Sequence, residues 1–114
     1  MATPNLLPGT LDVLVLKAIS LGEEHGYGLL QRIQRMSRDA LVIEQGALYP
    51  ALFRLERQGL ITAEWGQSES NRRAKFYSLT RAGKKQLEQD LVGWKRLVEA
   101  MELVLGAQGL EGAR

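Results

Sequence analysis

Apolar residues in the first half of the chain recur at the three- and four-residue spacing that is typical of amphipathic helices. This spacing predicts one helix over about residues 10–21, with Thr10 as its N-cap, and a second over about residues 27–37. The apolar face of the first would comprise Leu11, Leu14, Val15, Ala18 and Ile19, and that of the second Tyr27, Leu30, Ile33 and Met36. Both faces are expected to pack against other elements of the chain.

A third helix is predicted from near Gly46 to Gly59, because glycine is a preferred residue just beyond the end of a helix. Pro50 is expected in its first turn, where a missing backbone N–H costs little. The residues that share its apolar face are Leu48, Leu52 and Leu55. The pattern therefore predicts three short helices before the middle of the chain.

After Gly59 the pattern changes to that of extended chain. Residues 60–65 and 74–79 are typical of strands, and the polar residues 66–71 between them predict a hairpin. Thr80 is a suitable N-cap for a long helix over residues 81–105. Apolar residues of that helix alternate in spacing between four and three, at Leu87, Leu91, Trp94, Val98, Met101 and Leu105. Such an a/d pattern predicts that the helix pairs with a second chain.

The predicted element order is three helices, a hairpin and a final helix. We therefore expect a mainly α fold with a small β-hairpin, namely a winged helix-turn-helix plus a long C-terminal dimerisation helix. The expected organisation is a flexible arm at 1–9, a winged-helix domain at 10–80, the dimerisation helix at 81–105 and a flexible tail at 106–114. A chain of 114 residues is suited to one such domain.

Positive charge is concentrated in one segment of the chain. Residues 67–86 contain six Lys and Arg residues against Glu69 alone, whereas residues 1–66 have a net charge of −1 and residues 87–114 one of −2. A concentrated basic segment between nearly neutral flanks is typical of an anion-binding surface. A solvated loop is the alternative, and the charge count does not separate the two.

The third helix and the hairpin supply the candidate DNA-binding residues. On the exposed face of the helix these are Gln45, Gly46, Ala47, Tyr49 and Arg54, and on the hairpin they are Arg72, Arg73 and Lys75. Gln45 is suited to reading base edges, Tyr49 to a phosphate, and the hairpin cations to the DNA backbone or a minor groove. The alternative is that Tyr49 lies at the edge of the core and that Arg54 is a solvated charge.

The remaining chemistry of the sequence is sparse. There is no cysteine and one histidine, His25, which excludes thiolate metal sites, a cysteine nucleophile and His-pair zinc motifs. His25 is expected to pack or to cap the second helix. No carboxylate pair or phosphate-binding glycine loop is evident, so we expect no enzyme and no cofactor. Residues 1–9 do not resemble a signal peptide, and the apolar stretch 11–21 is too short to span a bilayer, which predicts a cytoplasmic protein.

Several segments of the chain carry a recognisable family pattern: Gly9–Asp12, His25–Gly28, Gly46–Leu52, Leu55–Glu56, Gly59–Ile61 and Asn71–Gly83. Together they resemble the PadR family of transcriptional regulators over about residues 9–105. The resemblance implies a winged-helix fold, a homodimer formed through the last helix, and repression of nearby promoters. It also implies that Leu11 and Leu14 of the first helix pack on the last helix of the partner.

The resemblance extends to a short subclass of the family with a single C-terminal helix. Some PadR regulators release DNA when they bind phenolic acids or drugs, and one multidrug-sensing member of the short subclass carries a tryptophan in its dimer helix. Trp94 is similar in position to that tryptophan. The resemblance therefore implies an effector site at Trp94, with Leu97 and Val98 beside it.

The sequence as a whole predicts a homodimeric DNA-binding regulator, a repressor on a dyad-symmetric operator that a small aromatic or phenolic effector would release. The expected partners are double-stranded DNA, a second copy of the chain and that effector, with no membrane. The alternative is a winged-helix module for protein–protein interaction, which has no need of Arg72, Arg73 and Lys75 together. Another winged-helix family such as MarR is a further alternative, which the motifs disfavour.

Overall fold

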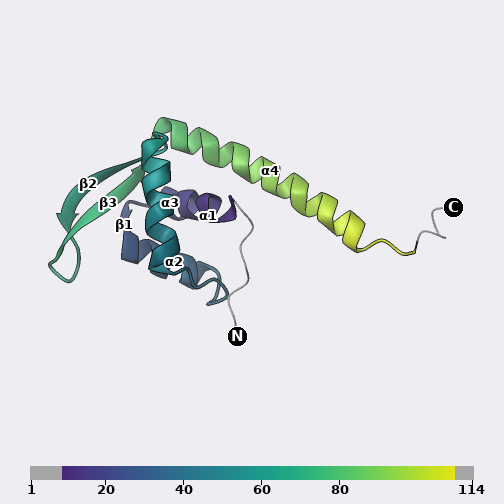
Figure 1. Ribbon diagram of the computed structural model, residues 1–114, viewed down its shortest axis with the longest axis horizontal. Coiled ribbons are helices and arrows are strands. Elements are labelled where there is room, and N and C mark those ends of the chain that lie inside the picture. Colours follow the sequence, from purple (N-terminus) through teal and green to yellow (C-terminus); the bar gives the residue numbers. More distant parts are fainter. Residues whose placement is uncertain (1–8, 110–114) are drawn as a thin grey trace.

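The computed structural model describes residues 9–109. The elements follow in the order α1 (Thr10–Ser20), β1 (Glu24–His25), α2 (Gly26–Met36), α3 (Gln45–Arg57), β2 (Ile61–Gln67), β3 (Arg73–Leu79) and α4 (Arg81–Leu105). Figure 1 shows α1, α2 and α3 packed together, the sheet beside α3, and α4 extending away from them. The predicted mainly α fold with a small hairpin is confirmed. The expected arm and tail lie largely outside the described residues.

The core is formed where the three short helices meet the sheet. Its largest fully buried side chains are Leu16 and Val15 of α1, Leu29 of α2, Leu48, Leu52 and Leu55 of α3, and Ile61 of β2. The predicted apolar face of α3 is therefore confirmed. Leu16 is buried although the predicted face of the first helix did not include it, because α1 contacts α2, α3, α4 and β3 together.

Two details of the first two helices differ from the prediction. The N-cap of α1 is Gly9, at φ +85°, and no side chain caps this end, so Thr10 is not the N-cap. On α2 the buried residues are Leu29, Leu30 and Ile33, while Tyr27 is 53% exposed. Leu29 and Leu30 both face the core, and at 100° per residue Tyr27 then lies about 110° from the centre of the buried stripe. Met36 is exposed at the last position of α2.

Two residues of the predicted third helix, the glycine at its end and the proline inside it, can be compared with α3. Gly59, at φ +75°, follows the C-cap, and the Leu60 N–H donates to the carbonyl of Leu55 at 3.0 Å, which is a Schellman motif. The predicted C-terminal glycine is thus confirmed. Pro50 is the sixth helical residue rather than a first-turn residue. Its missing N–H therefore removes a helical hydrogen bond to Gly46, whose position is exposed and open to water.

The wing, residues 61–79, is the β2–β3 hairpin. Its strands pair antiparallel from Ile61 opposite Leu79 to Gln67 opposite Arg73, slightly longer than predicted. In the turn, Asn71 has φ +63° and the Ser68 N–H donates to the carbonyl of Arg72 at 2.8 Å. The short strand β1 adds to the other edge of β3 and makes a three-stranded sheet in the order β1-β3-β2.

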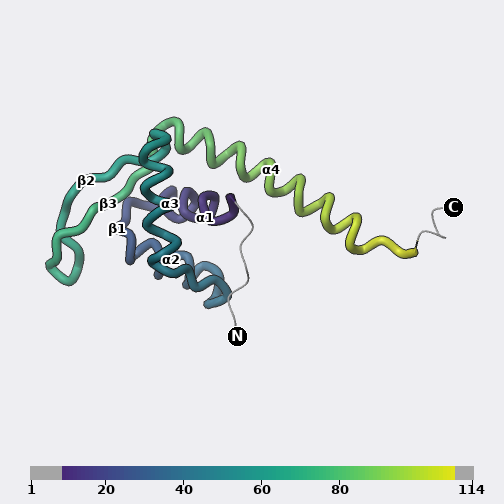
Figure 2. Tube along the Cα trace, in the orientation of Figure 1, coloured from purple at the N-terminus to yellow at the C-terminus, as the bar shows by residue number. Residues whose placement is uncertain are grey.

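The start of α4 is fixed to the short link between α3 and β2. Thr80 Oγ1 accepts a hydrogen bond from the Gly83 N–H at 3.0 Å and donates to the Gly59 carbonyl at 2.7 Å, so the predicted cap is confirmed. Gly83 lies against the backbone of Leu60, where a Cβ would be only 2.0 Å from the carbonyl oxygen. Beyond Leu87 no residue of α4 is fully buried, and the helix leaves the body of the protein (Figure 2).

Candidate nucleic-acid interface

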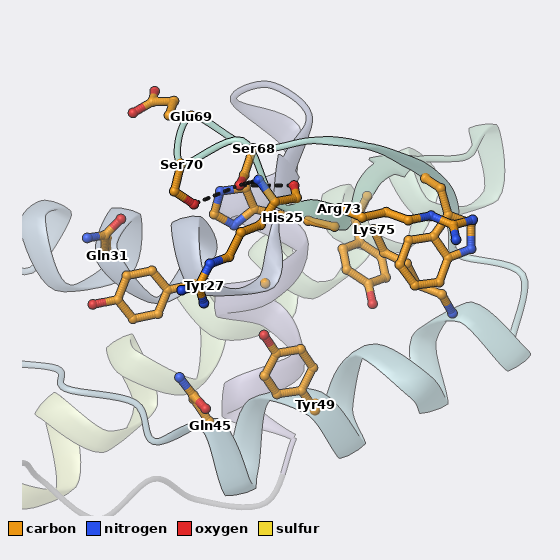
Figure 3. Close-up of a pocket in the computed structure, with 15 residues that line it drawn as sticks. His25, Tyr27, Gln31, Gln45, Tyr49, Ser68, Glu69, Ser70, Arg73 and Lys75 are labelled. Atoms are coloured by element: carbon orange, nitrogen blue, oxygen red, sulfur yellow. Dashed lines mark hydrogen bonds between the residues drawn. The ribbon is translucent and has the colours of Figure 1, made fainter.

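An open groove lies between α2, the start of α3 and the wing. Its volume is about 860 Å³. The side chains that line it come from three regions: His25, Tyr27 and Gln31 from the region of α2, Gln45 and Tyr49 from α3, and Trp65, Ser68, Glu69, Ser70, Arg72, Arg73, Ala74, Lys75 and Tyr77 from the wing. Figure 3 shows Gln45 and Tyr49 on α3 below the wing residues Arg73 and Lys75. The groove therefore brings together five of the eight candidate DNA-binding residues.

The α3 side of the groove is built around Tyr49. Gln45 and Tyr49 are one helical turn apart and face the groove together, and Tyr49 is 45% exposed. The Tyr49 ring lies against Gly26 of α2, where a Cβ would be 2.7 Å from the Tyr49 hydroxyl and 2.8 Å from Cε1. Because any side chain at Gly26 would meet this ring, the glycine is what allows Tyr49 its position in the groove.

The wing side of the groove is cationic and aromatic. Trp65 on β2 is 57% exposed, and Lys75 on β3 is its direct cross-strand partner. The guanidinium carbon of Arg73 lies 4.4 Å from the centre of the Trp65 ring, and the Lys75 Nζ lies 5.7 Å from it. Within residues 9–109 neither cation forms an ion pair with a carboxylate. Both charges remain available to an anion in the groove.

Tyr77 lies at the inner end of the groove, on the same face of β3 as Arg73 and Lys75. Burial raises the pKa of its hydroxyl above the ordinary value of 10.0, and the charge of Glu56 and the neighbouring Tyr49 raise the pKa further. The group is therefore a neutral hydroxyl near pH 7. It can offer a hydrogen bond without adding negative charge to a basic groove.

The other three candidate residues of α3 lie outside the groove lining. Gly46 and Ala47 are exposed at the start of the helix. Arg54 is directed to the other side, where its guanidinium donates to the Asp12 carboxylate of α1 at 2.8 Å. The structure therefore separates Arg54 from Gln45 and Tyr49.

Ten lining residues were absent from the sequence-based candidate list, among them Tyr27, Gln31, Trp65 and Tyr77. A usable signal existed for Tyr77, because strand alternation puts it on the same face as Arg73 and Lys75. The position of Tyr27 and Gln31 depends on how the wing folds back toward α2. The local periodicity of the sequence does not determine how close the wing comes to α2.

His25 has a structural role, as the sequence predicted. Its Nδ1 accepts a hydrogen bond from the Gly28 N–H at 3.0 Å and so caps α2. Its Nε2 lies 3.5 Å from Glu24 Oε1, and its ring meets Phe76 edge-on at 5.4 Å. These contacts fix β1 and the start of α2 against the wing, which holds two walls of the groove in register.

A second surface, the apolar face of α4, is separate from the groove. Of the predicted dimer residues on α4, Leu87 is buried and Val98 is half-buried. The other four, Leu91, Trp94, Met101 and Leu105, are exposed. Trp94 is 46% exposed, and its neighbour Leu97 is similarly exposed. On α1, Leu11 and Leu14 are half-buried. An apolar face of this length is unusual on a surface that stays in water.

Two features are absent from the part of the chain that the structure describes. No three His, Asp or Glu side chains in residues 9–109 are grouped as a metal site would require. None of the helices in that range is both long and apolar enough to cross a membrane.

Known proteins share this architecture. A PadR family transcriptional regulator from Eggerthella lenta is 31% identical, with a TM-score of 0.74 over 88% of this chain and 85% of that one. A PadR-like transcriptional regulator from Bacillus cereus is 26% identical, with a TM-score of 0.75 over 88% of this chain and 95% of that one. The Escherichia coli transcriptional regulator YqjI is 30% identical over 82 residues, which are 72% of this chain but 38% of that protein.

The family pattern covers most of the winged-helix body. The model of the transcriptional regulator PadR-like family matches residues 15–89, from α1 to the first turns of α4. Regulators of this family bind DNA and are not enzymes, which agrees with the expectation from the sequence. The chain therefore belongs to the PadR-like family of transcriptional regulators.

Proposed function

We propose that this regulator acts as a homodimer that binds a dyad-symmetric operator through the groove between α3 and the wing. The observation that carries the proposal is the shared groove itself. Gln45 and Tyr49 of α3 line it together with Arg72, Arg73 and Lys75 of the wing. A helix that offers an amide and a hydroxyl beside a cationic hairpin is suited to base edges and phosphates at once.

In this proposal α3 enters the major groove by its N-terminal end. Gly46 and Ala47 are small and exposed, so the backbone there can approach the duplex closely, and free N–H groups at a helix start favour phosphate. Gln45 would read a base edge and Tyr49 would contact a phosphate. Arg54, paired with Asp12, would reach the backbone only at the periphery.

The proposed dimer forms along α4. Its contact residues would be Leu87, Leu91, Trp94, Val98, Met101 and Leu105, with Leu11 and Leu14 of α1 packing on the α4 of the partner. The exposed apolar face supports this, because burial in a second copy removes it from water. Two copies of α3 would then meet half-sites about 10 bp apart, or a multiple of that spacing.

We further propose that operator binding represses transcription and that an aromatic or phenolic effector relieves it. Trp94, Leu97 and Val98 would contact the effector at the dimer interface. An effector that prefers a dimer geometry unsuited to DNA shifts the population away from the bound form. Access to DNA also argues for a cytoplasmic location.

The test is a titration of the gene's own upstream DNA with the purified protein at two salt concentrations. We expect retardation at low salt and a steep loss of affinity as salt rises. Reversal of charge at two wing residues, Arg72→Glu with Arg73→Glu, should weaken binding and flatten the salt dependence. The matched control is Lys84→Glu with Lys85→Glu, which changes net charge equally at residues outside the groove lining.

Two outcomes would contradict the proposal. If the wild-type protein does not bind this DNA at low salt, DNA is not its partner. The chain would then be interpreted as a protein–protein interaction module. An unchanged salt slope in the Arg72 and Arg73 variant, with loss in the control, would move the binding surface away from the wing.

A further inference from the structure

We propose that Trp65 is a positioning residue of the wing, which holds Arg73 and Lys75 toward the groove so that they are already in place for nucleic-acid phosphates. This inference rests on the proposed DNA-binding function. It adds a role for a side chain that need not touch DNA itself. It also divides the wing cations into two kinds, those that are supported by the tryptophan and those that are not.

The register of the wing puts the three side chains on one face. Trp65 pairs directly with Lys75, and Arg73 lies two residues before Lys75 on the same strand. Side chains two apart on a strand point to the same face, so both cations lie on the same face of the wing as the indole. The distances to the ring centre, 4.4 Å from the Arg73 guanidinium carbon and 5.7 Å from the Lys75 Nζ, are within the range of cation–π contacts.

The contact leaves the binding capacity of Arg73 intact. A guanidinium stacks through its flat face, whereas its N–H donors lie in its plane and point outward. Within the described residues the Arg73 and Lys75 side chains donate no hydrogen bond to a protein acceptor and form no ion pair. Arg73 can therefore lie on Trp65 and bind a phosphate through two parallel hydrogen bonds at the same time.

Trp65 would strengthen binding because it orders the two cationic side chains before DNA is bound. Long cationic side chains lose rotamer freedom when they grip a phosphate, and this loss weakens binding. Stacking on an indole restricts that freedom in the free protein, so less remains to be lost. Trp65 is more than half exposed and lies outside the buried core, which makes this role separable from folding.

Arg72 is the internal comparison. It follows Asn71 in the turn and lines the same groove, but among the described residues it makes no cation–π contact. Arg72 and Arg73 therefore have the same charge and nearly the same location, and they differ in the support that Trp65 gives. Any effect of Trp65 that acts through positioning must depend on Arg73 and not on Arg72.

The experiment is a double-mutant cycle on the full chain, read by fluorescence anisotropy with a labelled mixed-sequence DNA duplex at low salt. Trp65→Ala should weaken binding by about threefold to tenfold and leave the salt slope unchanged, because no charge is removed. Trp65→Phe should restore most of the loss. Combining Trp65→Ala with Arg73→Ala should cost less than the product of the two single effects, whereas combining it with Arg72→Ala should cost the full product.

A DNA-free measurement completes the test. In the free wild-type protein the Arg73 Nε–H signal should show the upfield ring-current shift of a stacked guanidinium, and Trp65→Ala should abolish it. Wild-type affinity in Trp65→Ala, or a full product with Arg73→Ala, would overturn the positioning role while the DNA-binding proposal stands. A wild-type protein that binds no duplex at low salt would overturn both.

Discussion

Two helices of this protein have nearly the same apolar spacing, but the apolar face of one is buried and that of the other is exposed. On α3, Leu48, Leu52 and Leu55 are fully buried by α1, α2 and the wing of the same chain. On α4, Leu91, Trp94 and Met101 follow a comparable spacing and are 40–47% exposed. Periodicity therefore identifies an apolar face, but the neighbouring elements decide whether the chain itself can cover it.

The length of α4 accounts for the difference. A helix of 25 residues is about 37 Å long, and its fully buried residues, Gly83 and Leu87, both lie in its first two turns. The remaining turns extend past every other element (Figure 1). The core of the body is thus buried within one chain, whereas the same chain leaves the apolar face of α4 exposed. The two regions should respond differently to substitution.

The largest expected effect is loss of folding stability in the body. Leu52→Ala removes most of a side chain that is fully buried in the core, and a large-to-small change of this kind costs about 2–5 kcal/mol. Urea denaturation should show the loss at every protein concentration. Val92→Ala, at an exposed apolar position of α4 outside the a/d pattern, is the control and should change little.

A charge in the α4 face should act on association instead. Trp94→Glu would bury a carboxylate in the proposed interface, and we expect the dimer dissociation constant to rise by about 100-fold, roughly 2.8 kcal/mol. Sedimentation at several concentrations measures the change, with Glu99→Gln on α4 as the control. If Trp94→Glu leaves the assembly state unchanged, α4 is not the dimer helix, and a second copy of the chain does not cover its apolar face.

The parts of the fold that could be predicted from sequence are those with local signals. Gly59 and Thr80 mark the end of α3 and the start of α4, and both function as caps in the structure. The strand β1 could not be predicted, because two residues show no alternation and pair with a strand about fifty residues away. The Arg54–Asp12 pair joins residues 42 apart, and no local pattern reports it.

The candidate site was predictable to a similar extent. Exposed positions on α3 and a basic hairpin identified Gln45, Tyr49 and the wing cations, since each signal lies within one element. The opposing wall of the groove was missed, because Tyr27 and Gln31 enter it through the packing of α2 against the wing. Trp65 was missed because a lone aromatic on a strand is ordinary, and its meaning depends on the cross-strand register.

A third prediction separates function from stability within the body. Gly26→Ala should displace Tyr49, since the new Cβ would be 2.7 Å from its hydroxyl. Tyr49 is partly exposed and can move outward, so the free energy of unfolding should change little, while DNA affinity falls by about tenfold, roughly 1.4 kcal/mol. The double variant Gly26→Ala with Tyr49→Ala should bind no worse than Tyr49→Ala alone. A further loss in the double variant would show that Gly26 acts through something other than the Tyr49 ring.

The smallest expected effect concerns Tyr77 at the inner end of the groove. Burial, with the charge of Glu56 and the neighbouring Tyr49, holds the pKa of this hydroxyl above 10.0 in the folded state. The neutral form is then favoured by folding, and its contribution is complete below pH 10. As pH rises above 10 the unfolded chain ionises first, so the free energy of unfolding should fall until the folded pKa is passed. Tyr77→Phe removes this ionisation, so in urea titrations across that range the free energy of unfolding of the wild type should fall relative to that of the variant as pH rises. A constant difference between them would mean that Tyr77 ionises equally well in the folded and unfolded chains, and that the groove does not shield it as the structure indicates.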